Sequence, residues 1–187
     1  QKRQKAALEL NKIITDKLKD LSFTDGNFEV NLKPIEPSVN GGESVEFLIS
    51  TYLNAEPKPI QKVASGGELS RISLAIRVAS IKRANVPVMI FDEVDVGIGG
   101  GVAEVVGKLL KDLADDRRHQ IFVVTHLPQV AAQSLNHYKV SKDQISSETI
   151  SKINLLDESG RVNELARMLG GVEITEATLE HAKELLN

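Results

Sequence analysis

The sequence has no cysteine among its 187 residues. That absence excludes a disulfide scaffold, a thiol nucleophile and cysteine-bound zinc, and it fits a reducing compartment. No apolar run approaches the ~20 residues that cross a bilayer, so we expect a cytoplasmic protein with no membrane partner. The formal net charge is only −3. Contact with nucleic acid would therefore depend on a local patch and not on the overall charge.

The chain also lacks the phosphate-binding pattern G-x-x-x-x-G-K-[ST]. Gly107-Lys108 is followed by Leu109 and has no glycine at the required place upstream. Any site for a nucleotide would therefore need residues from elsewhere. The sequence starts with Gln1-Lys2-Arg3, without an initiator Met, and we expect an excised fragment.

Hydrophobic residues make up 41% and charged residues 26% of the chain, which is ordinary for a soluble globular domain. Hydrophobic periodicity, caps and turn residues divide the chain into expected helices and strands. The expected helices are 1–21, 68–84, 101–114, 161–169 and 175–186, and the expected strands are 27–33, 44–52, 86–91, 121–124, 137–141 and 148–155.

Two kinds of strand are expected. Residues 86–91 and 121–124 are continuous apolar runs separated by a helix, which predicts a βαβ unit with strands buried on both faces of a parallel sheet. Residues 27–33 and 44–52 alternate instead, which predicts an antiparallel layer joined through a proline-rich turn region at Asn40-Gly41-Gly42. The fold class is therefore α/β, with a mostly parallel sheet flanked by helices and a small antiparallel β layer.

The N-terminal helix carries apolar residues at spacings of three and four, and six basic against three acidic side chains. Two interpretations stay open. The helix either packs on the domain with a solvated outer face, or it is the end of a longer coiled coil.

The segment Ser65-Gly66-Gly67-Glu68 opens a predicted helix with two bare glycines and the Ser-x-x-Glu spacing of a capping box. A serine hydroxyl beside the free amides of a helix start can bind phosphate. The simpler alternative is that these residues only cap the helix.

Acidic and imidazole side chains follow the two apolar strands. Asp92 and Glu93 come directly after the first, and His126 after the second, so neighbouring parallel strands would bring them to one edge of the sheet. An Asp there can hold Mg²⁺ through waters, a Glu can deprotonate water, and an imidazole N–H can polarise a phosphate oxygen. Taken singly, each has a structural alternative as a cap, a solvated loop residue or a scaffold histidine.

The ordered set of motifs resembles that of the ABC-type ATPases. Ser65 to Arg71 resembles their signature motif, Val88 to Glu93 their Walker B strand, Asp95 to Gly100 their D-loop, and Thr125-His126 their switch histidine. Within that superfamily, the sequences of residues 91–98, 125–132 and 164–171 are similar to those of bacterial DNA repair ATPases related to the structural-maintenance-of-chromosomes (SMC) proteins. The resemblance covers roughly residues 20 to 187.

This resemblance implies the C-terminal lobe of an ABC/SMC-type ATPase head. Residues 1–21 would end a coiled-coil helix, and residues 22–187 would form the C-terminal half of the head. The implied partners are the protein's own N-terminal half, which carries Walker A, a second head that joins by ATP-dependent homodimerisation, and DNA. The implied function is DNA double-strand break repair and recombination, close to the nucleoid.

The resemblance also implies roles for single residues toward ATP and Mg²⁺. Ser65, Gly66 and Gly67, with Glu68 of the same motif, would bind the γ-phosphate held by the other head. Asp92 would serve Mg²⁺, Glu93 the hydrolytic water and His126 the γ-phosphate. Asp95 would help to couple the two sites.

Two other functions remain open at this stage. Because Walker A is missing, the chain could be a docking module that acts without catalysis. The signature segment by itself also allows an ABC transporter ATPase domain, although the wording after Walker B favours the repair family.

Overall fold

The computed structural model describes the chain in seven stretches that divide into two compact units. The described residues are 1–62, 65–81, 86–92, 94–115, 119–145, 148–171 and 173–187. The first unit comprises Gln1–Met89 and Val96–Ile98, and the second comprises Ile90–Asp95 and Gly99–Asn187. The boundary falls within a strand, so each unit is described by itself.

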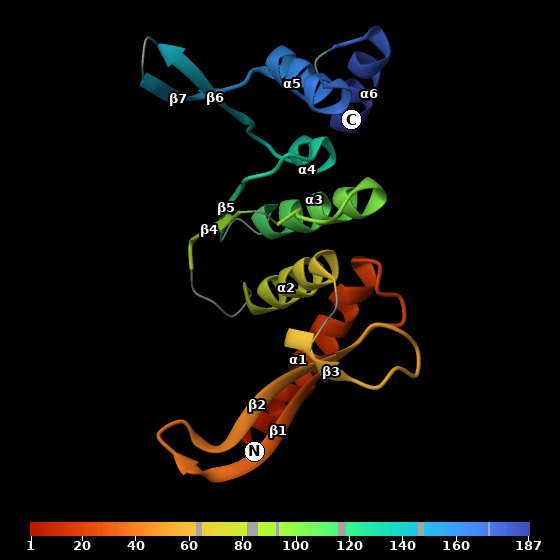
Figure 1. The fold of residues 1–187 in the computed structure, drawn as a ribbon, viewed down its shortest axis with the longest axis vertical. Helices are drawn as coiled ribbons and strands as arrows, with labels where there is room; N and C mark the ends of the chain where they lie inside the picture. The colour runs from red at the N-terminus through yellow and green to blue at the C-terminus, as the bar shows by residue number, and fades with distance from the viewer. Residues whose placement is uncertain (63–64, 82–85, 93, 116–118, 146–147, 172) are drawn as a thin grey trace. The chain divides into compact units, whose positions relative to one another are not determined.

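The first unit packs a long helix on a three-stranded antiparallel sheet of order β1-β2-β3, and a second helix packs on the first helix (Figure 1). Its core includes Ile14, Leu18 and Phe28, which are at most 1% exposed. The expected antiparallel layer is confirmed. The elements are α1 (Lys2–Asp20), β1 (Asn27–Ser38), β2 (Gly41–Ser50), β3 (Lys58–Pro59), the 3-10 turn η1 (Ile60–Lys62) and α2 (Gly66–Ile81).

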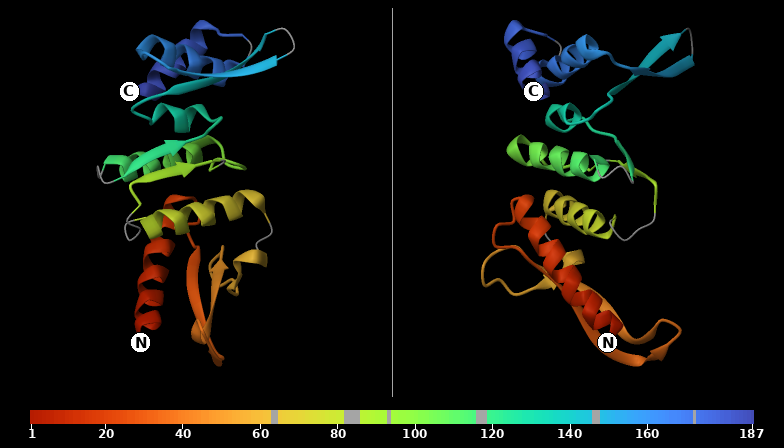
Figure 2. Two further views of the ribbon diagram at one scale, coloured as in Figure 1. Left: turned by 90° about the vertical axis from the view of Figure 1, so that its left-hand side faces the viewer. Right: turned by 180° about the vertical axis from the view of Figure 1, so that it is seen from behind.

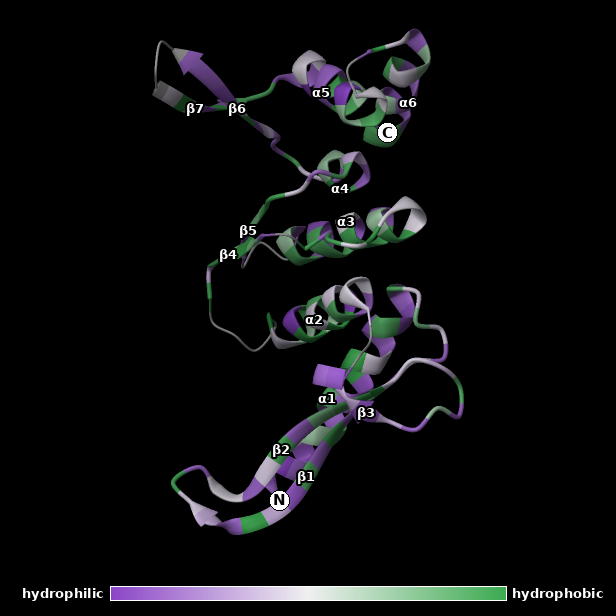
Figure 3. Ribbon diagram, viewed as in Figure 1, coloured by the Kyte–Doolittle hydropathy of each residue, from purple (hydrophilic) through white to green (hydrophobic). Residues whose placement is uncertain are grey.

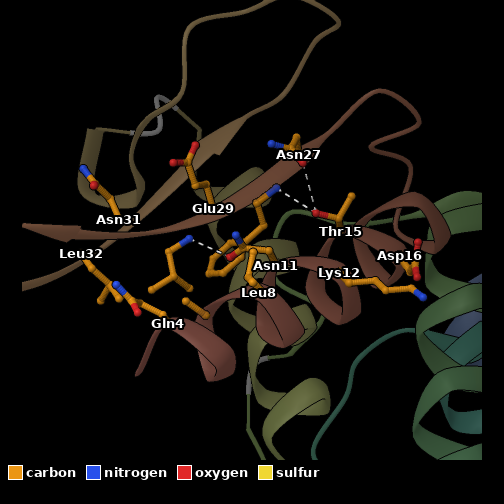
Figure 4. Close-up of a pocket in the computed structure, with 13 residues that line it drawn as sticks. Gln4, Leu8, Asn11, Lys12, Thr15, Asp16, Asn27, Glu29, Asn31 and Leu32 are labelled. Carbon is orange, nitrogen blue, oxygen red and sulfur yellow. Dashed lines mark hydrogen bonds between the residues drawn. The ribbon is translucent and has the colours of Figure 1, made fainter. Parts of the chain in front are cut away.

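Strand β1 is an edge strand, and α1 occupies its open side. Asn11 accepts a hydrogen bond from the Val30 amide at 2.8 Å, and Thr15 accepts one from the Phe28 amide at 3.0 Å (Figure 4). The groove drawn in Figure 4 lies along this contact. Because side chains of α1 satisfy these amides, the edge is closed to pairing with another strand there.

The turn between β1 and β2 is shorter than the expected proline-rich turn, so the predicted extent was wrong. Strand β1 continues through Pro34 and Pro37, and Pro34 pairs with Glu43 of β2. Proline has no N–H to donate, but an edge strand needs donors on one side only, so it tolerates proline there.

The second unit contains two small sheets and four helices (Figures 1 and 2). Helix α3 packs on β5 and α4, and α5 packs on α6 around Leu165 and Ala182, both fully buried. The short helix α4 was not expected, because five residues give too little periodicity to detect. The elements are β4 (Val88–Phe91), α3 (Gly100–Asp115), β5 (Gln120–Val123), α4 (Pro128–Ala132), β6 (Tyr138–Ile145), β7 (Glu148–Leu155), α5 (Glu158–Gly170) and α6 (Glu176–Leu186).

The expectation that β4 and β5 are buried on both faces was wrong. Exposure alternates along them: Phe91 is buried, whereas Ile90 is 67% and Phe122 43% exposed. Helix α3 covers one face, and the apolar side chains of the other face remain open to solvent (Figure 3 colours both strands largely as hydrophobic). Strands β4 and β5 thus carry more hydrophobic surface than the rest of this chain buries.

A network of charges holds α5 in place. Glu164 is 7% exposed and contacts Lys139 of β6 at 2.5 Å and Arg167 at 2.6 Å. Burial by itself would raise the pKa of Glu164, but the hydrogen bonds from Arg167 and Lys139 outweigh it and hold that pKa below its ordinary value. Arg161 donates to the Ser134 carbonyl at 2.6 Å, just after α4. This network ties the C-terminal helices to the segment that follows His126.

Candidate functional site

The ends of β4 and β5 lie side by side. The two strands form a parallel pair, and the Val124 amide donates to the Phe91 carbonyl at 2.8 Å (Figure 2). Asp92 follows Phe91 directly, and Thr125-His126 follows Val124. The expectation that these residues meet at one edge of a sheet is therefore confirmed for Asp92 and His126. Glu93 lies outside the described residues.

Asp95 is the best-connected residue of the site. Its side chain is 1% exposed, and its Oδ2 accepts hydrogen bonds from the Thr125 hydroxyl and, at 3.1 Å, from the His126 amide. The same oxygen lies 3.4 Å from His126 Nδ1. From the sequence we expected Asp95 to help couple two sites, but we missed Thr125 as the hydrogen-bond partner of Asp95. The available signal was an Asp just beyond one apolar run with a Thr-His pair just beyond the next.

The groups that could meet a ligand are open to solvent. The His126 side chain is 71% exposed, and Asp92 is exposed as well. Within the described stretches, no three His, Cys, Asp or Glu side chains gather into a metal site. A lone exposed carboxylate suits Mg²⁺, which keeps several waters and usually takes one or two carboxylates plus phosphate oxygens.

The signature segment forms the first turn of α2. The Ser65 hydroxyl accepts a hydrogen bond from the Glu68 amide at 3.1 Å, so Ser65 caps the helix as expected. The helix begins at Gly66, so the amides of Gly66 and Gly67 have no acceptor within it. A Cβ built on Gly66 would meet nothing within 4 Å. The helix start is thus open where an anion would approach.

Gly67 is glycine for a different reason. A Cβ there would stand 2.6 Å from the Gly97 carbonyl oxygen, and Gly97 itself has a φ of +72°. The loop after Asp95 therefore passes directly against the first turn of α2, within the first unit. Close backbone packing explains why residue 67 is a glycine, whereas the open space around Gly66 leaves room for a ligand.

These two glycines give a matched pair of substitutions. We expect Gly67→Ala to destabilise the chain by about 1–3 kcal/mol, because the methyl group overpacks the contact with Gly97. We expect Gly66→Ala to change the free energy of unfolding by at most about 1 kcal/mol. Urea unfolding followed by circular dichroism measures both. Equal destabilisation by the two variants would contradict this account of Gly67.

The candidate residues are divided between the two units. Ser65, Gly66, Gly67 and Glu68 belong to the first unit, whereas Asp92, Asp95 and His126 belong to the second. The groove along α1 and β1 is lined by none of them.

Solved structures with a similar fold are heads of SMC proteins. The Smc head domain with a coiled coil and joint derived from Pyrococcus yayanosii matches 87% of this chain and 29% of its own, with a TM-score of 0.68 and 23% identity. A chain from a study titled "Structural biochemistry of ATP-driven dimerization and DNA stimulated activation of SMC ATPases" matches 88% of this chain and 94% of its own, with a TM-score of 0.64 and 21% identity. The fold is that of an ABC/SMC ATPase head lobe, as expected.

The sequence is similar to the DNA repair protein RecN along nearly its whole length. It is 48% identical to RecN of Xylella fastidiosa (strain Temecula1) over 98% of this chain and 33% of that protein. It is 44% identical to RecN of Haemophilus influenzae over 99% of this chain and 33% of that protein. The chain thus spans about a third of the length of these relatives. No family model matches it.

These comparisons confirm the resemblance to the SMC-like repair ATPases. Among the described residues, the helices are all too short or too polar to cross a membrane.

Proposed function

We propose that this chain is the C-terminal lobe of an ATP-hydrolysing head in a RecN-like protein of DNA double-strand break repair and recombination. The observation that carries the proposal is the placement of Asp92 and Thr125-His126 directly after two adjacent parallel strands, with buried Asp95 hydrogen-bonded to the Thr125-His126 segment. Ligands bind at this edge of α/β sheets. Similarity to RecN supports the repair family over an ABC transporter domain.

Each candidate residue takes one task toward ATP. The Ser65 hydroxyl and the amides of Gly66 and Gly67 suit the γ-phosphate presented by another head, with Glu68 in the same turn. Asp92 supplies a carboxylate for Mg²⁺, which neutralises phosphate charge when bound. Glu93 serves as base for the attacking water and His126 contacts the γ-phosphate, while Asp95 links the D-loop to His126.

The open face of β4 and β5 supports a partner that carries Walker A. Ile90, Phe122 and Val124 are 67%, 43% and 57% exposed, and apolar strand residues of this kind are normally buried in a parallel sheet. We propose that the N-terminal half of the head covers this face and supplies the missing phosphate loop. We further propose that the complete head pairs with a second head and contacts DNA. The proposed location is the cytoplasm, in association with the nucleoid.

Residues 1–21 are proposed as the end of a coiled-coil helix, followed by head residues 22–187. Helix α1 packs on β1 and α2 through Ala7, Ile14 and Leu18. Leu8 on α1 is 72% exposed, which leaves an apolar side chain for a second helix.

Association with the Walker A half is testable by a matched pair of variants. We expect this chain to bind the N-terminal segment of the Xylella fastidiosa relative, and Ile90→Ser to weaken that binding by about tenfold, because it removes an apolar contact worth about 1.5 kcal/mol or more. Val39→Ser changes a side chain of the first unit that is fully exposed at the β1–β2 turn, and should leave binding unchanged. Analytical ultracentrifugation measures both. Absence of any complex, or equal loss in both variants, contradicts the proposed docking face.

A docking role without catalysis is the second candidate, because Walker A is absent from the sequence. It predicts the same complex with no ATP hydrolysis by the mixture.

A further inference from the structure

A single carboxylate oxygen organises the segment that carries His126. Asp95 Oδ2 accepts hydrogen bonds from the Thr125 hydroxyl and the His126 amide, and it lies 3.4 Å from His126 Nδ1. All three groups belong to the second unit. Both the main chain and the side chain of His126 therefore face the same buried charge.

Thr125 connects this carboxylate to the next residue as well. Its hydroxyl donates to Asp95 and accepts a hydrogen bond from the Leu127 amide at 3.0 Å. A buried carboxylate is stable only when it is well hydrogen-bonded. Because Thr125 and the His126 amide supply those bonds, the Asp95 side chain is held next to the imidazole.

The position of Asp95 decides which imidazole nitrogen carries the proton. A lone pair on Nδ1 would face a carboxylate oxygen at 3.4 Å and be repelled by it, whereas an N–H there is attracted. A solvated neutral histidine ordinarily prefers the proton on Nε2, and a carboxylate beside Nδ1 acts against this preference.

We propose that Thr125 is a positioning residue: together with Asp95 it holds neutral His126 with the proton on Nδ1, leaving Nε2 as the atom that meets the ligand. The catalytic role of this arrangement rests on the proposed function, whereas the tautomer of His126 does not. A neutral imidazole of this tautomer accepts a hydrogen bond at Nε2. It donates to a phosphate oxygen only after a proton has been added there. The sequence-based expectation of a donating imidazole therefore applies to the charged form alone.

The tautomer is measurable in this chain without nucleotide. Long-range ¹H–¹⁵N correlation spectra, recorded at a pH where histidines are neutral, distinguish a protonated from an unprotonated nitrogen in each ring. We expect His126 to show a protonated Nδ1, and His181, which is exposed on α6, to show the ordinary protonated Nε2 as an internal reference. A His126 spectrum of the same type as that of His181 would overturn the proposal.

Two variants separate Thr125 from general structural effects. Thr125→Val keeps the shape but removes the hydroxyl, and we expect it to lose the Nδ1–H signature; Thr125→Ser keeps the hydroxyl and should retain it. An unchanged spectrum in a folded Thr125→Val variant would overturn the role of Thr125. If that variant does not fold, the wild-type and Thr125→Ser spectra still decide the tautomer. None of these outcomes depends on ATP, so failure of the proposed function is distinguished by ATP binding and turnover measured separately.

Discussion

Glu93→Gln is expected to lower ATP turnover of the assembled head by about 10²–10⁴-fold, while ATP remains bound. That range is typical for loss of a general acid–base group, because a neutral amide cannot take a proton from water. The measurement is steady-state phosphate release by this chain mixed with a Walker A-bearing segment, together with equilibrium binding of ATP.

The matched control is Glu104→Gln. Glu104 pairs with Lys108 on the exposed surface of α3 and is not one of the candidate site residues, so its substitution should leave turnover unchanged. Undiminished turnover in Glu93→Gln would remove Glu93 as the base, and equal losses in both variants would indicate a nonspecific effect.

Asp95→Ala is expected to have the largest effect on stability, lowering the free energy of unfolding by about 2–4 kcal/mol. The substitution deprives the Thr125 hydroxyl and the His126 amide of their acceptor, and unsatisfied polar groups in a protein interior cost about 1–3 kcal/mol each. Chemical denaturation of this chain alone provides the measurement.

Asp112→Ala serves as the control for this prediction. Asp112 is an exposed carboxylate on α3, and its loss should stay within about 0.5 kcal/mol. If Asp95→Ala unfolds at the same denaturant concentration as Asp112→Ala, the buried hydrogen bonds of Asp95 contribute no net stability.

The helices and the caps were largely predictable from the sequence, because their determinants are local. Thr175 caps α6 and Gly171 ends α5 with a φ of +72°, and both are residue types that commonly occupy these helix ends. The expected helix at 68–84 begins at Gly66 and continues to Ile81, where the described residues stop.

The burial of β4 and β5 was not predictable from the sequence, because an apolar run does not indicate which of its side chains the rest of the chain covers. Ile90 and Phe122 are as hydrophobic as core residues, yet both are exposed in this chain. The pattern cannot say whether the covering surface comes from the same polypeptide segment.

The placement of Asp92 and His126 was predictable, but the hydrogen bonds of Asp95 were not. The order of motifs indicated that Asp92 and His126 follow two adjacent strands, as the structure has them, whereas the roles of these residues toward a ligand stay predictions. The hydrogen bond that joins Asp95 to Thr125 links residues 30 apart in the sequence and depends on tertiary packing, which no local pattern encodes. The contact between Gly67 and Gly97 is likewise a product of tertiary packing.

The most direct measurement of the central claim is ATP hydrolysis by this chain, by a Walker A-bearing N-terminal segment of a RecN relative, and by their mixture. We predict no turnover by either part and clear turnover by the mixture, because phosphate loop and strand-end residues are then present together. Hydrolysis by this chain alone, or a stable complex of the two parts without hydrolysis, would contradict the account.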